Sequence, residues 1–316
     1  MINIVTIGGG SGSFQLLLAL KKINFVNISA IVTMCDNGGS TGILRTVYGI
    51  LPPGDVRNCL VALSEESQVW TTIFSYRFDE NLQSHNLGNL ILTALTKHFN
   101  SFERALEEAH KLLNVKHKVI PLTYNHVDLK GTFSDGTCCI GEKEITEYCK
   151  KSKLEKLEII SEERTIFPNP KVIEAIRSSD FILVGPGSFY TSILSNLVFP
   201  SISDEINKSK AKKIYICNIM NDFETLGFTV KDYIQKIENF IKVDIIIVNS
   251  SAPPSELLEK YKEEGKSIPK IDIKDPRIIA ADLLNAKNVL RHDPEKLGRL
   301  LEWIFLTNTE NETKKA

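Results

Sequence analysis

Short apolar runs rich in valine and isoleucine recur along the chain, and each ends in a small or polar segment. Runs of this length and composition are typical of strands that are buried on both faces of a parallel sheet. The runs lie at residues 2–7, 28–34, 181–184, 213–217 and 243–248. The first ends in three glycines, Gly8 to Gly10, and the second ends just before Asp36. We therefore predict a strand at each run, followed by a loop suited to ligand binding.

Segments with helical periodicity alternate with these runs. In residues 102–113, Ala105, Leu106 and Ala109 recur at helical spacing, which predicts an amphipathic helix. Further helices are predicted at 58–64, 172–177, 202–208, 230–240 and 295–306. Residues 67–76 fit a helix and an extended segment equally well. The alternation predicts an α/β fold with a parallel sheet covered on both faces, whose ligand site lies at the carboxyl ends of the strands.

The pattern changes between residues 118 and 160. Short predicted strands alternate there with turns, at 119–123, 127–133, 138–140 and 157–160. We interpret this segment as a structural β-rich insertion at about 118–160 rather than as a separate functional module. The chain shows no internal repeat, so its 316 residues are expected to form a single domain, residues 1–316, that carries the insertion.

Composition and charge narrow the possible function classes. The hydrophobic fraction of 42% and the charged fraction of 24% are ordinary for a soluble globular protein, and a net charge of −1 gives no overall attraction to nucleic acid. The six cysteines contain no C-x-x-C pair and fit buried reduced thiols. The amino terminus lacks the basic segment of a signal peptide, and no apolar stretch is long enough to span a membrane. We expect a cytoplasmic protein without a membrane span.

The loop after the first strand is an imperfect dinucleotide-binding fingerprint. Gly8 and Gly10 match the first two glycines of G-x-G-x-x-G, whereas Ser13 takes the third position. The loop is not a P-loop, because no Gly-Lys-Ser/Thr follows. Glycines at such a turn let an anion approach the backbone N–H groups at the start of a helix. We favour a phosphate-binding loop over a tight turn without a ligand.

Two acids lie in further glycine-bearing turns. Asp36 ends the second strand, and Asp55 lies between Gly54 and Arg57. Two carboxylates near a phosphate are suited to Mg²⁺, while turn formation or helix capping is the alternative for each. Arg45 and Arg57 are suited to a diphosphate, with a surface ion pair as the alternative. Asp36 and Asp55 are therefore the metal ligands to expect if Mg²⁺ binds.

Polar side chains also gather in later segments. Residues 85–89 place His, Asn and Asn ahead of an apolar helix, which suits hydrogen bonds to a base or a sugar, although capping would explain one of them. Residues 185–188 form a second glycine loop directly after a strand. Tyr261 offers a stacking face and Arg291 a cation, but structural roles explain them better as lone residues. No Ser-His-Asp or Cys-His arrangement is evident, so the sequence indicates a binding site more clearly than a catalyst.

Taken together, these motifs resemble the YvcK family of gluconeogenesis factors, which are relatives of the CofD 2-phospho-L-lactate transferases. The matching segments cover nearly the whole chain: GGGSG, CDNGGSTG, LPPGDVRNCLVALS, HNLGNLIL, VGPGSFYTSILSNL and YICNIMND. The resemblance implies a three-layer Rossmann-like fold of the CofD type. It also implies binding of UDP-sugars such as UDP-N-acetylglucosamine, and a role in cell shape and cell-wall synthesis on gluconeogenic carbon sources.

The resemblance also places the family's motifs on numbered residues. Its glycine loop falls on Gly8–Gly12, its acid-glycine loop on Asp36–Gly42 and its P-P-G-D turn on Pro52–Asp55. Its N-L-G-N motif falls on Asn86–Asn89 and its G-P-G-S motif on Gly185–Ser188. With polar residues that follow later strands, the candidate ligand-binding residues are Gly8, Gly9, Gly10, Ser11, Gly12, Asp36, Asn37, Gly38, Gly39, Ser40, Asp55, Arg57, Asn86, Asn89, Gly185, Gly187, Ser188, Asn218, Tyr261 and Arg291.

Two functions from different classes fit these residues. The first is a UDP-sugar-binding regulatory protein that controls a partner in cell-wall synthesis without catalysis. The second is a Mg²⁺-dependent transferase of the CofD kind, which needs at least two acids around the metal. The family usually has a second acid where this chain has Asn37, and no general base is evident, so we favour the regulator. We expect a UDP-sugar ligand, Mg²⁺ if a metal binds, a cell-wall-synthesis partner, and self-association into a homo-oligomer.

Overall fold

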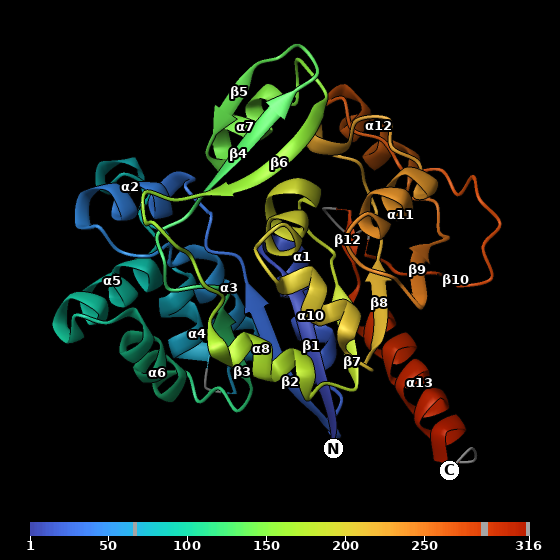
Figure 1. The fold of residues 1–316 in the computed structure, drawn as a ribbon, viewed down its shortest axis with the longest axis horizontal. Helices are drawn as coiled ribbons and strands as arrows, with labels where there is room; N and C mark the ends of the chain where they lie inside the picture. Colours follow the sequence, from blue (N-terminus) through green and yellow to red (C-terminus); the bar gives the residue numbers. More distant parts are fainter. Residues whose placement is uncertain (66–67, 286–289, 314–316) are drawn as a thin grey trace.

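Seven parallel strands form the central sheet, in the order β10-β9-β8-β7-β1-β2-β3 (Figure 1). The computed structural model describes residues 1–65, 68–285 and 290–313. The strands of this sheet are β1 (Ile2–Gly8), β2 (Val26–Val32), β3 (Lys118–Pro121), β7 (Phe181–Val184), β8 (Lys212–Ile216), β9 (Ile245–Asn249) and β10 (Ile278–Ala281). The predicted α/β fold with a parallel sheet is confirmed.

Strands β1 and β7 lie side by side at the centre of the sheet. Ile4 pairs with Phe181, and Ile7 pairs with Val184. All four residues of β7 and the last five residues of β1 are buried. Because helices cover such strands on both faces, every position needs an apolar or small residue, which explains the continuous Val and Ile runs of the sequence.

Helices flank the sheet, and polar residues cap several of their amino termini. Asn86 accepts a hydrogen bond from the Asn89 N–H at 3.1 Å, and Ser101 accepts one from the Arg104 N–H at 3.3 Å. The α-helices are α1 (Gly10–Lys21), α2 (Gly39–Tyr48), α3 (Gly54–Leu63), α4 (Gln68–Ser75), α5 (Leu87–Phe99), α6 (Phe102–Leu112), α7 (Glu142–Tyr148), α8 (Pro170–Arg177), α9 (Ser195–Leu197), α10 (Ile202–Lys208), α11 (Val230–Glu238), α12 (Ser255–Glu263) and α13 (Pro294–Thr313). Helix α1 packs against α3 and α13, whereas α8 packs against α10.

The ambiguous segment 67–76 is helical from Gln68 to Ser75, and residue 67 lies outside the described residues. The buried Phe74 on α4 explains its apolar centre. Shorter elements complete the fold: the 3₁₀ turns η1 (Glu80–Leu82) and η3 (Phe223–Thr225), the π-helical segment η2 (Phe189–Leu194), and the antiparallel pair β11 (Leu284–Asn285) and β12 (Arg291–His292).

A three-stranded antiparallel sheet forms the insertion, in the order β5-β4-β6, together with helix α7. Its strands are β4 (Asp128–Phe133), β5 (Cys138–Ile140) and β6 (Leu154–Ile160). The predicted start at about residue 118 is wrong, because residues 118–121 form β3 and pair with β2 at the edge of the main sheet. Figure 1 shows the insertion at the end of the molecule opposite the N-terminus, beyond the carboxyl ends of the central strands.

The strand order fixes where a ligand site belongs. From β1 the chain proceeds to β2 and β3 on one side, and β7 to β10 follow on the other side. Parallel sheets of this kind have their ligand crevice where the order reverses, outside the carboxyl ends of the two central strands. Here those strands are β1 and β7, each of which leads into a glycine loop. Within the described residues, every helix is too short or too polar to cross a membrane.

Candidate functional site

The loops after β1 and β7 meet at the reversal point, and glycine makes their close approach possible. A Cβ atom on Gly12 would lie 2.5 Å from the carbonyl oxygen of Pro186 and 2.8 Å from the Cα of Gly187. Asn218, after β8, joins the second loop: its Nδ2 donates to the Gly187 carbonyl at 2.8 Å, and its Oδ1 accepts from the Gly187 N–H at 3.3 Å. Three loops that are distant in sequence therefore form one wall of a site.

A cavity of about 260 Å³ opens beside this wall. Seven of the predicted residues line it: Ser11, Gly12, Gly187, Ser188, Asn218, Tyr261 and Arg291. Arg291 is exposed and makes no ion pair with any described residue, so its charge is available to a ligand. The Tyr261 hydroxyl accepts from the Leu290 N–H at 3.2 Å, and Lys266 Nζ lies 5.4 Å from the centre of the tyrosine ring. The cavity is slightly smaller than those that hold a whole cofactor, and suits one portion of a larger ligand.

Asp36 and Asp55 flank the other side of the first glycine loop. A Cβ atom on Gly9 would lie 2.4 Å from Asp55 Oδ2, and one on Gly54 would lie 2.8 Å from Asp36 Oδ2. Burial raises the pKa of Asp55 to about 7, and the neighbouring Asp36 adds to the rise. Burial also raises the pKa of Asp36, although the Gly38 N–H donates to its Oδ1 at 2.8 Å. Two acids are thus held close together at the loop that is proposed to bind phosphate.

These two acids fit Mg²⁺ only as a partial ligand set. No three His, Cys, Asp or Glu side chains among the described residues are placed to share one metal ion. Mg²⁺ is commonly held by one or two carboxylates, with water and substrate phosphate as the other ligands. The elevated pKa values reflect two buried carboxyl groups near each other, a situation that a cation would relieve. Asp36 and Asp55 would be the protein ligands of such an ion.

Two further acids, which the sequence analysis did not identify, lie near Asp36 and Asp55 or near the second glycine loop. Glu142, at the start of α7, brings the insertion to the acids, and burial together with Asp36 and Asp55 raises its pKa well above the usual value. Glu224 accepts from the Tyr190 N–H at 2.7 Å and from the Thr191 hydroxyl at 2.6 Å. Glu142 comes more than a hundred residues after Asp36, and Glu224 follows it by eighty more, so no local motif could have associated them with the glycine loops.

Several predicted polar residues are hydrogen-bonded within the protein. Ser40 Oγ lies 3.0 Å from His85 Nδ1, and it accepts from the Asn86 N–H at 3.3 Å and from Asn89 Nδ2 at 3.4 Å. Asn86 also caps α5, which leaves Asn86 Nδ2 and Asn89 Oδ1 buried without a partner among the described residues. The structure therefore joins residues 40 and 85–89 in one network, with two polar atoms left for a ligand or water.

The two arginines are held by protein groups. Arg45 Nη1 is 2.8 Å from Asp128 Oδ1, and its Nη2 donates to the Val127 carbonyl, so this side chain joins the insertion to α2. Arg57 Nη2 donates to Asn58 Oδ1 at 2.6 Å, and burial lowers the pKa of Arg57 to about 10. Arg57 Nε is buried and has no partner within the described chain. For Arg45, the structure shows an ion pair, which was the alternative to diphosphate binding.

Asn37 holds the insertion rather than facing the glycine loop. Its Nδ2 donates to Glu144 Oε2 at 2.7 Å, and its Oδ1 accepts from the Lys143 N–H at 3.0 Å. Gly38 caps α2, and Gly39 adopts a φ of +44° that favours glycine. Gly8 ends β1, Gly10 has a φ of +63°, and Gly185 has a φ of +77° directly after β7. These glycines shape the loops of the site.

His292 is a further residue that the sequence did not single out. It lies on β12, lines the 260 Å³ cavity and is 5% exposed. Its Nε2 is buried without a hydrogen-bond partner among the described residues. Burial lowers the pKa of His292 to about 4, so the ring is neutral at physiological pH.

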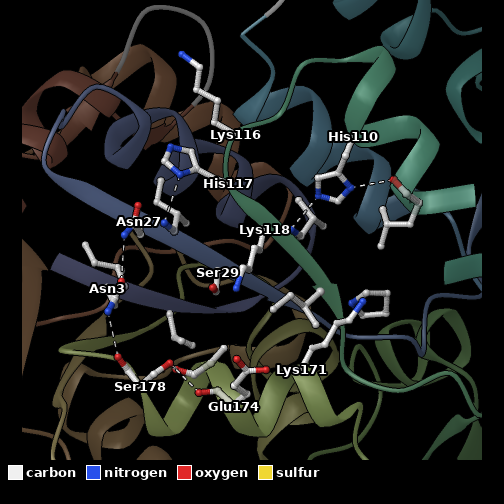
Figure 2. Close-up of a pocket in the computed structure, with 18 of the residues that line it drawn as sticks. Asn3, Asn27, Ser29, His110, Lys116, His117, Lys118, Lys171, Glu174 and Ser178 are labelled. Atoms are coloured by element: carbon white, nitrogen blue, oxygen red, sulfur yellow. Dashed lines mark hydrogen bonds between the residues drawn. The ribbon is translucent and has the colours of Figure 1, made fainter. Parts of the chain in front are cut away.

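A second cavity, of about 770 Å³, lies near the amino ends of β1 and β2, away from the glycine loops (Figure 2). It is formed by the starts of β1, β2 and β3 with α6 and α8, and none of the predicted site residues lines it. His110 is structural there, because its Nδ1 lies 2.8 Å from the Leu106 carbonyl and its Nε2 accepts from the Val119 N–H at 3.2 Å. Lys171 forms an ion pair with Glu103. The lining thus has charges of both signs and favours no single ligand class.

Comparisons with known proteins cover nearly the whole chain. A model of the family described as 2-phospho-L-lactate transferase CofD matches residues 4–288. The gluconeogenesis factor of Bacillus subtilis is 40% identical over 311 residues, which cover 95% of this chain and 96% of that protein. That of Listeria monocytogenes is 36% identical over 322 residues, or 98% and 97% of the two chains. A crystal structure of a UPF0052 family protein from Bacillus halodurans has a TM-score of 0.88 and 37% identity, covering 95% of this chain and 99% of that one.

Proposed function

The chain belongs to the CofD family and, within it, to the proteins called gluconeogenesis factors, and on this premise we propose that it binds UDP-sugars such as UDP-N-acetylglucosamine. The family resemblance inferred from the motifs is confirmed. In this proposal the protein is a regulator: occupancy of the nucleotide-sugar site controls a partner protein of cell-wall synthesis, and through it cell shape during growth on gluconeogenic carbon sources.

One observation carries the proposal. The glycine loops after β1 and β7 meet at the reversal point of the sheet, with an unpaired Arg291 and the ring of Tyr261 beside them within the described part of the chain. Backbone N–H groups at a helix start and an arginine are suited to a diphosphate, and an aromatic ring is suited to a base or sugar face. The cavity of about 260 Å³ suits the nucleoside portion, which leaves the sugar near the acids beyond Gly9.

Calorimetric titration of the purified protein with UDP-N-acetylglucosamine tests the proposal. We expect saturable binding in the absence of Mg²⁺, and much weaker binding of NAD. A protein that is folded, as judged by a cooperative thermal transition, and that gives no heat with UDP-sugars at millimolar concentration would refute the UDP-sugar proposal. Affinity capture from cells grown on gluconeogenic carbon, with and without added UDP-sugar, then tests the partner: ligand-dependent capture of a cell-wall-synthesis protein is expected.

A second candidate is a Mg²⁺-dependent transferase like 2-phospho-L-lactate transferase. The observation that favours it is the pair Asp36 and Asp55 at the glycine loop. Mg²⁺ bound there would neutralise phosphate charge and orient the group to be transferred. Against it, the chain has Asn37 rather than an acid beside Asp36, and Arg45 is paired with Asp128 rather than free for a phosphate. Binding of a guanosine nucleotide that requires Mg²⁺ would favour this candidate over the regulator.

A further inference from the structure

We propose that Lys266 is a second cation that binds the diphosphate of the ligand, together with Arg291. This inference rests on the proposed function, because it concerns the diphosphate of the same nucleotide-sugar. It adds a ligand-binding residue that lies outside every motif of the family resemblance: the last of these motifs ends at Asp222, whereas Lys266 comes after α12.

The charge of the 260 Å³ cavity is the first support. Lys266 and Arg291 are its two cationic lining residues within the described part of the chain, and Asp222 is its one acidic residue there. The Asp222 carboxylate is already engaged, because its Oδ1 accepts from the Glu224 N–H at 3.0 Å and from the Thr225 hydroxyl at 3.1 Å. The cavity is therefore locally positive on a protein whose net charge is −1, and it favours an anionic group.

Two aromatic rings hold the ammonium group of Lys266 at the cavity. Its Nζ lies 5.4 Å from the centre of the Tyr261 ring and 5.9 Å from that of the Phe223 ring, within the range of cation–π attraction. A lysine side chain is otherwise flexible, so the two rings reduce the cost of ordering it when a ligand binds. The side chain is 25% exposed and lines the cavity, so a ligand can reach the ammonium group.

The backbone beside Lys266 is fixed to the loop that follows β8. The Asn221 N–H donates to the Ser267 carbonyl at 2.7 Å, and Asn221 Nδ2 donates to Ser267 Oγ at 3.1 Å. The Lys266 N–H donates to the Tyr261 carbonyl at 2.9 Å, which closes the turn after α12. Asn218, in the same loop after β8, holds the second glycine loop. One loop therefore sets the position of the cation relative to the second glycine loop, as a shared phosphate site requires.

The ion pair of Lys266 with Glu264 does not withdraw this cation from a ligand. Lys266 Nζ donates to Glu264 Oε2 at 2.7 Å, and the Glu264 side chain is 44% exposed. Exposed ion pairs contribute little to stability, and an ammonium group has three N–H donors, of which Glu264 takes one. A diphosphate carries more charge than a carboxylate and forms charge-assisted hydrogen bonds with lysine. A ligand phosphate can therefore bind to the remaining donors.

Calorimetric titration of Lys266→Met with UDP-N-acetylglucosamine and UDP tests this inference. Methionine keeps much of the length of the side chain and removes its charge. We expect both ligands to bind at least about tenfold more weakly than to the unmodified protein, because a charge-assisted hydrogen bond is lost. Lys262→Met is the matched control and should bind normally, since Lys262 is exposed on α12 and lies outside the cavity. Unchanged affinity in a folded Lys266→Met protein would overturn the role of Lys266 and leave the proposed function standing.

Rescue and salt dependence separate a direct charge contact from a structural role. Lys266→Arg keeps the charge, so we expect its affinity for UDP to stay within about threefold of that of the unmodified protein. The affinity of Lys266→Met for UDP should fall less steeply with added salt, because one charge contact is absent. An arginine variant that binds as weakly as the methionine variant, or an equal salt dependence, would contradict the inference. Absence of binding of UDP and UDP-N-acetylglucosamine to the unmodified protein would instead overturn the proposed function, and this inference with it.

Discussion

Several buried side-chain polar atoms have no hydrogen-bond partner among the described residues, and they include Arg57 Nε, Asn86 Nδ2, Asn89 Oδ1 and Glu142 Oε2. An unpaired buried polar atom costs on the order of 1–3 kcal/mol of stability. The elements farther from the site, such as α6 and α11, have well-formed caps and apolar inner faces.

The buried acid Glu224 should make the stability of the free protein depend on pH. Burial, with Asp222, raises its folded-state pKa to about 7, from an ordinary value of 4.5. Between these values the folded state holds a proton that the unfolded chain has lost, so the free energy of unfolding falls as pH rises from about 4.5 to about 7. We expect wild type to lose on the order of 2 kcal/mol relative to Glu224→Gln between pH 5 and pH 8 in urea unfolding.

A matched comparison isolates this effect. Glu147 is exposed on α7, and its pKa is lowered by the hydrogen bond with Lys150 rather than raised. The stability difference between wild type and Glu147→Gln should therefore be nearly the same at the two pH values. If the difference for Glu224→Gln were also independent of pH, Glu224 would not be protonated in the folded state.

Replacing Asn37 by aspartate should loosen the insertion. An aspartate at this position could not donate to Glu144, and the two carboxylates would face each other where the amide now bonds at 2.7 Å. We expect Asn37→Asp to lower stability by about 1 kcal/mol and to speed proteolysis within residues 128–160. Adding Glu144→Gln to the Asn37→Asp variant restores a donor and should recover most of the loss. Strictly additive effects of the two changes would show that the pair is not coupled.

At the scale of elements, the site is made by the contact between the loops of β1 and β7. Neither loop forms the site alone: Gly12 follows β1 and Gly187 follows β7, and residues 4 and 181 of these two strands are paired partners. Asn218 adds the end of β8 to the same wall through two hydrogen bonds. The geometry of the wall thus depends on strand pairing as much as on the glycines themselves.

Adding one methyl group to Gly12 should separate these loops. The new Cβ would lie 2.5 Å from the Pro186 carbonyl oxygen, which is backbone and cannot rotate away. We expect Gly12→Ala to lower the free energy of unfolding by about 1–3 kcal/mol and to weaken UDP-sugar binding at least tenfold. Asn24→Ala is the control, since Asn24 is exposed in the turn that follows the same helix and lies outside the cavity. Normal binding by Gly12→Ala would argue against a ligand at this wall.

The sequence predicts elements better than it predicts their association. The strand at 181–184 and the helix at 202–208 have the predicted bounds, because a continuous apolar run and an amphipathic period are local signals. The sequence pattern assigns the strand at 118–121 to the insertion, because its pairing with β2 depends on residues some ninety positions away. Glu142, Glu224 and His292 reach the site through equally distant contacts, and each looks like an ordinary surface residue in its own segment.

At the scale of the whole molecule, the candidate cavity lies between the two halves of the sheet, β1 to β3 and β7 to β10. The cavity is lined by residues after β1 on one side and after β7 and β8 on the other. The insertion contacts the rest of the molecule on both sides of the sheet. It bonds to Asn37 and Arg45, and Thr146 donates to Glu224 at 3.0 Å. Occupancy of the site should therefore stabilise the protein as a unit rather than one loop.

Thermal unfolding with and without UDP-N-acetylglucosamine measures this effect. At a ligand concentration one hundred times the dissociation constant, binding to the folded state adds about 2.7 kcal/mol, which corresponds to a rise of several degrees in Tm. The same concentration of NAD should leave Tm unchanged. A transition that splits into two, with only one part shifted by the ligand, would show that the halves respond separately.

The pairing of β1 with β7 also has a consequence for the order in which the chain is made. The Asn3 N–H donates to Asp180, 177 residues later in the chain. Strand β1 therefore cannot pair with β7 until more than half of the protein has been synthesised. At ribosomal speeds of about 5–20 residues per second, that interval is roughly 10–35 seconds. During it, β1, β2 and β3 can already associate with α1 to α6, while one edge of β1 remains open. The edge that later becomes the centre of the ligand site is thus the surface of the nascent chain that most needs protection from other chains.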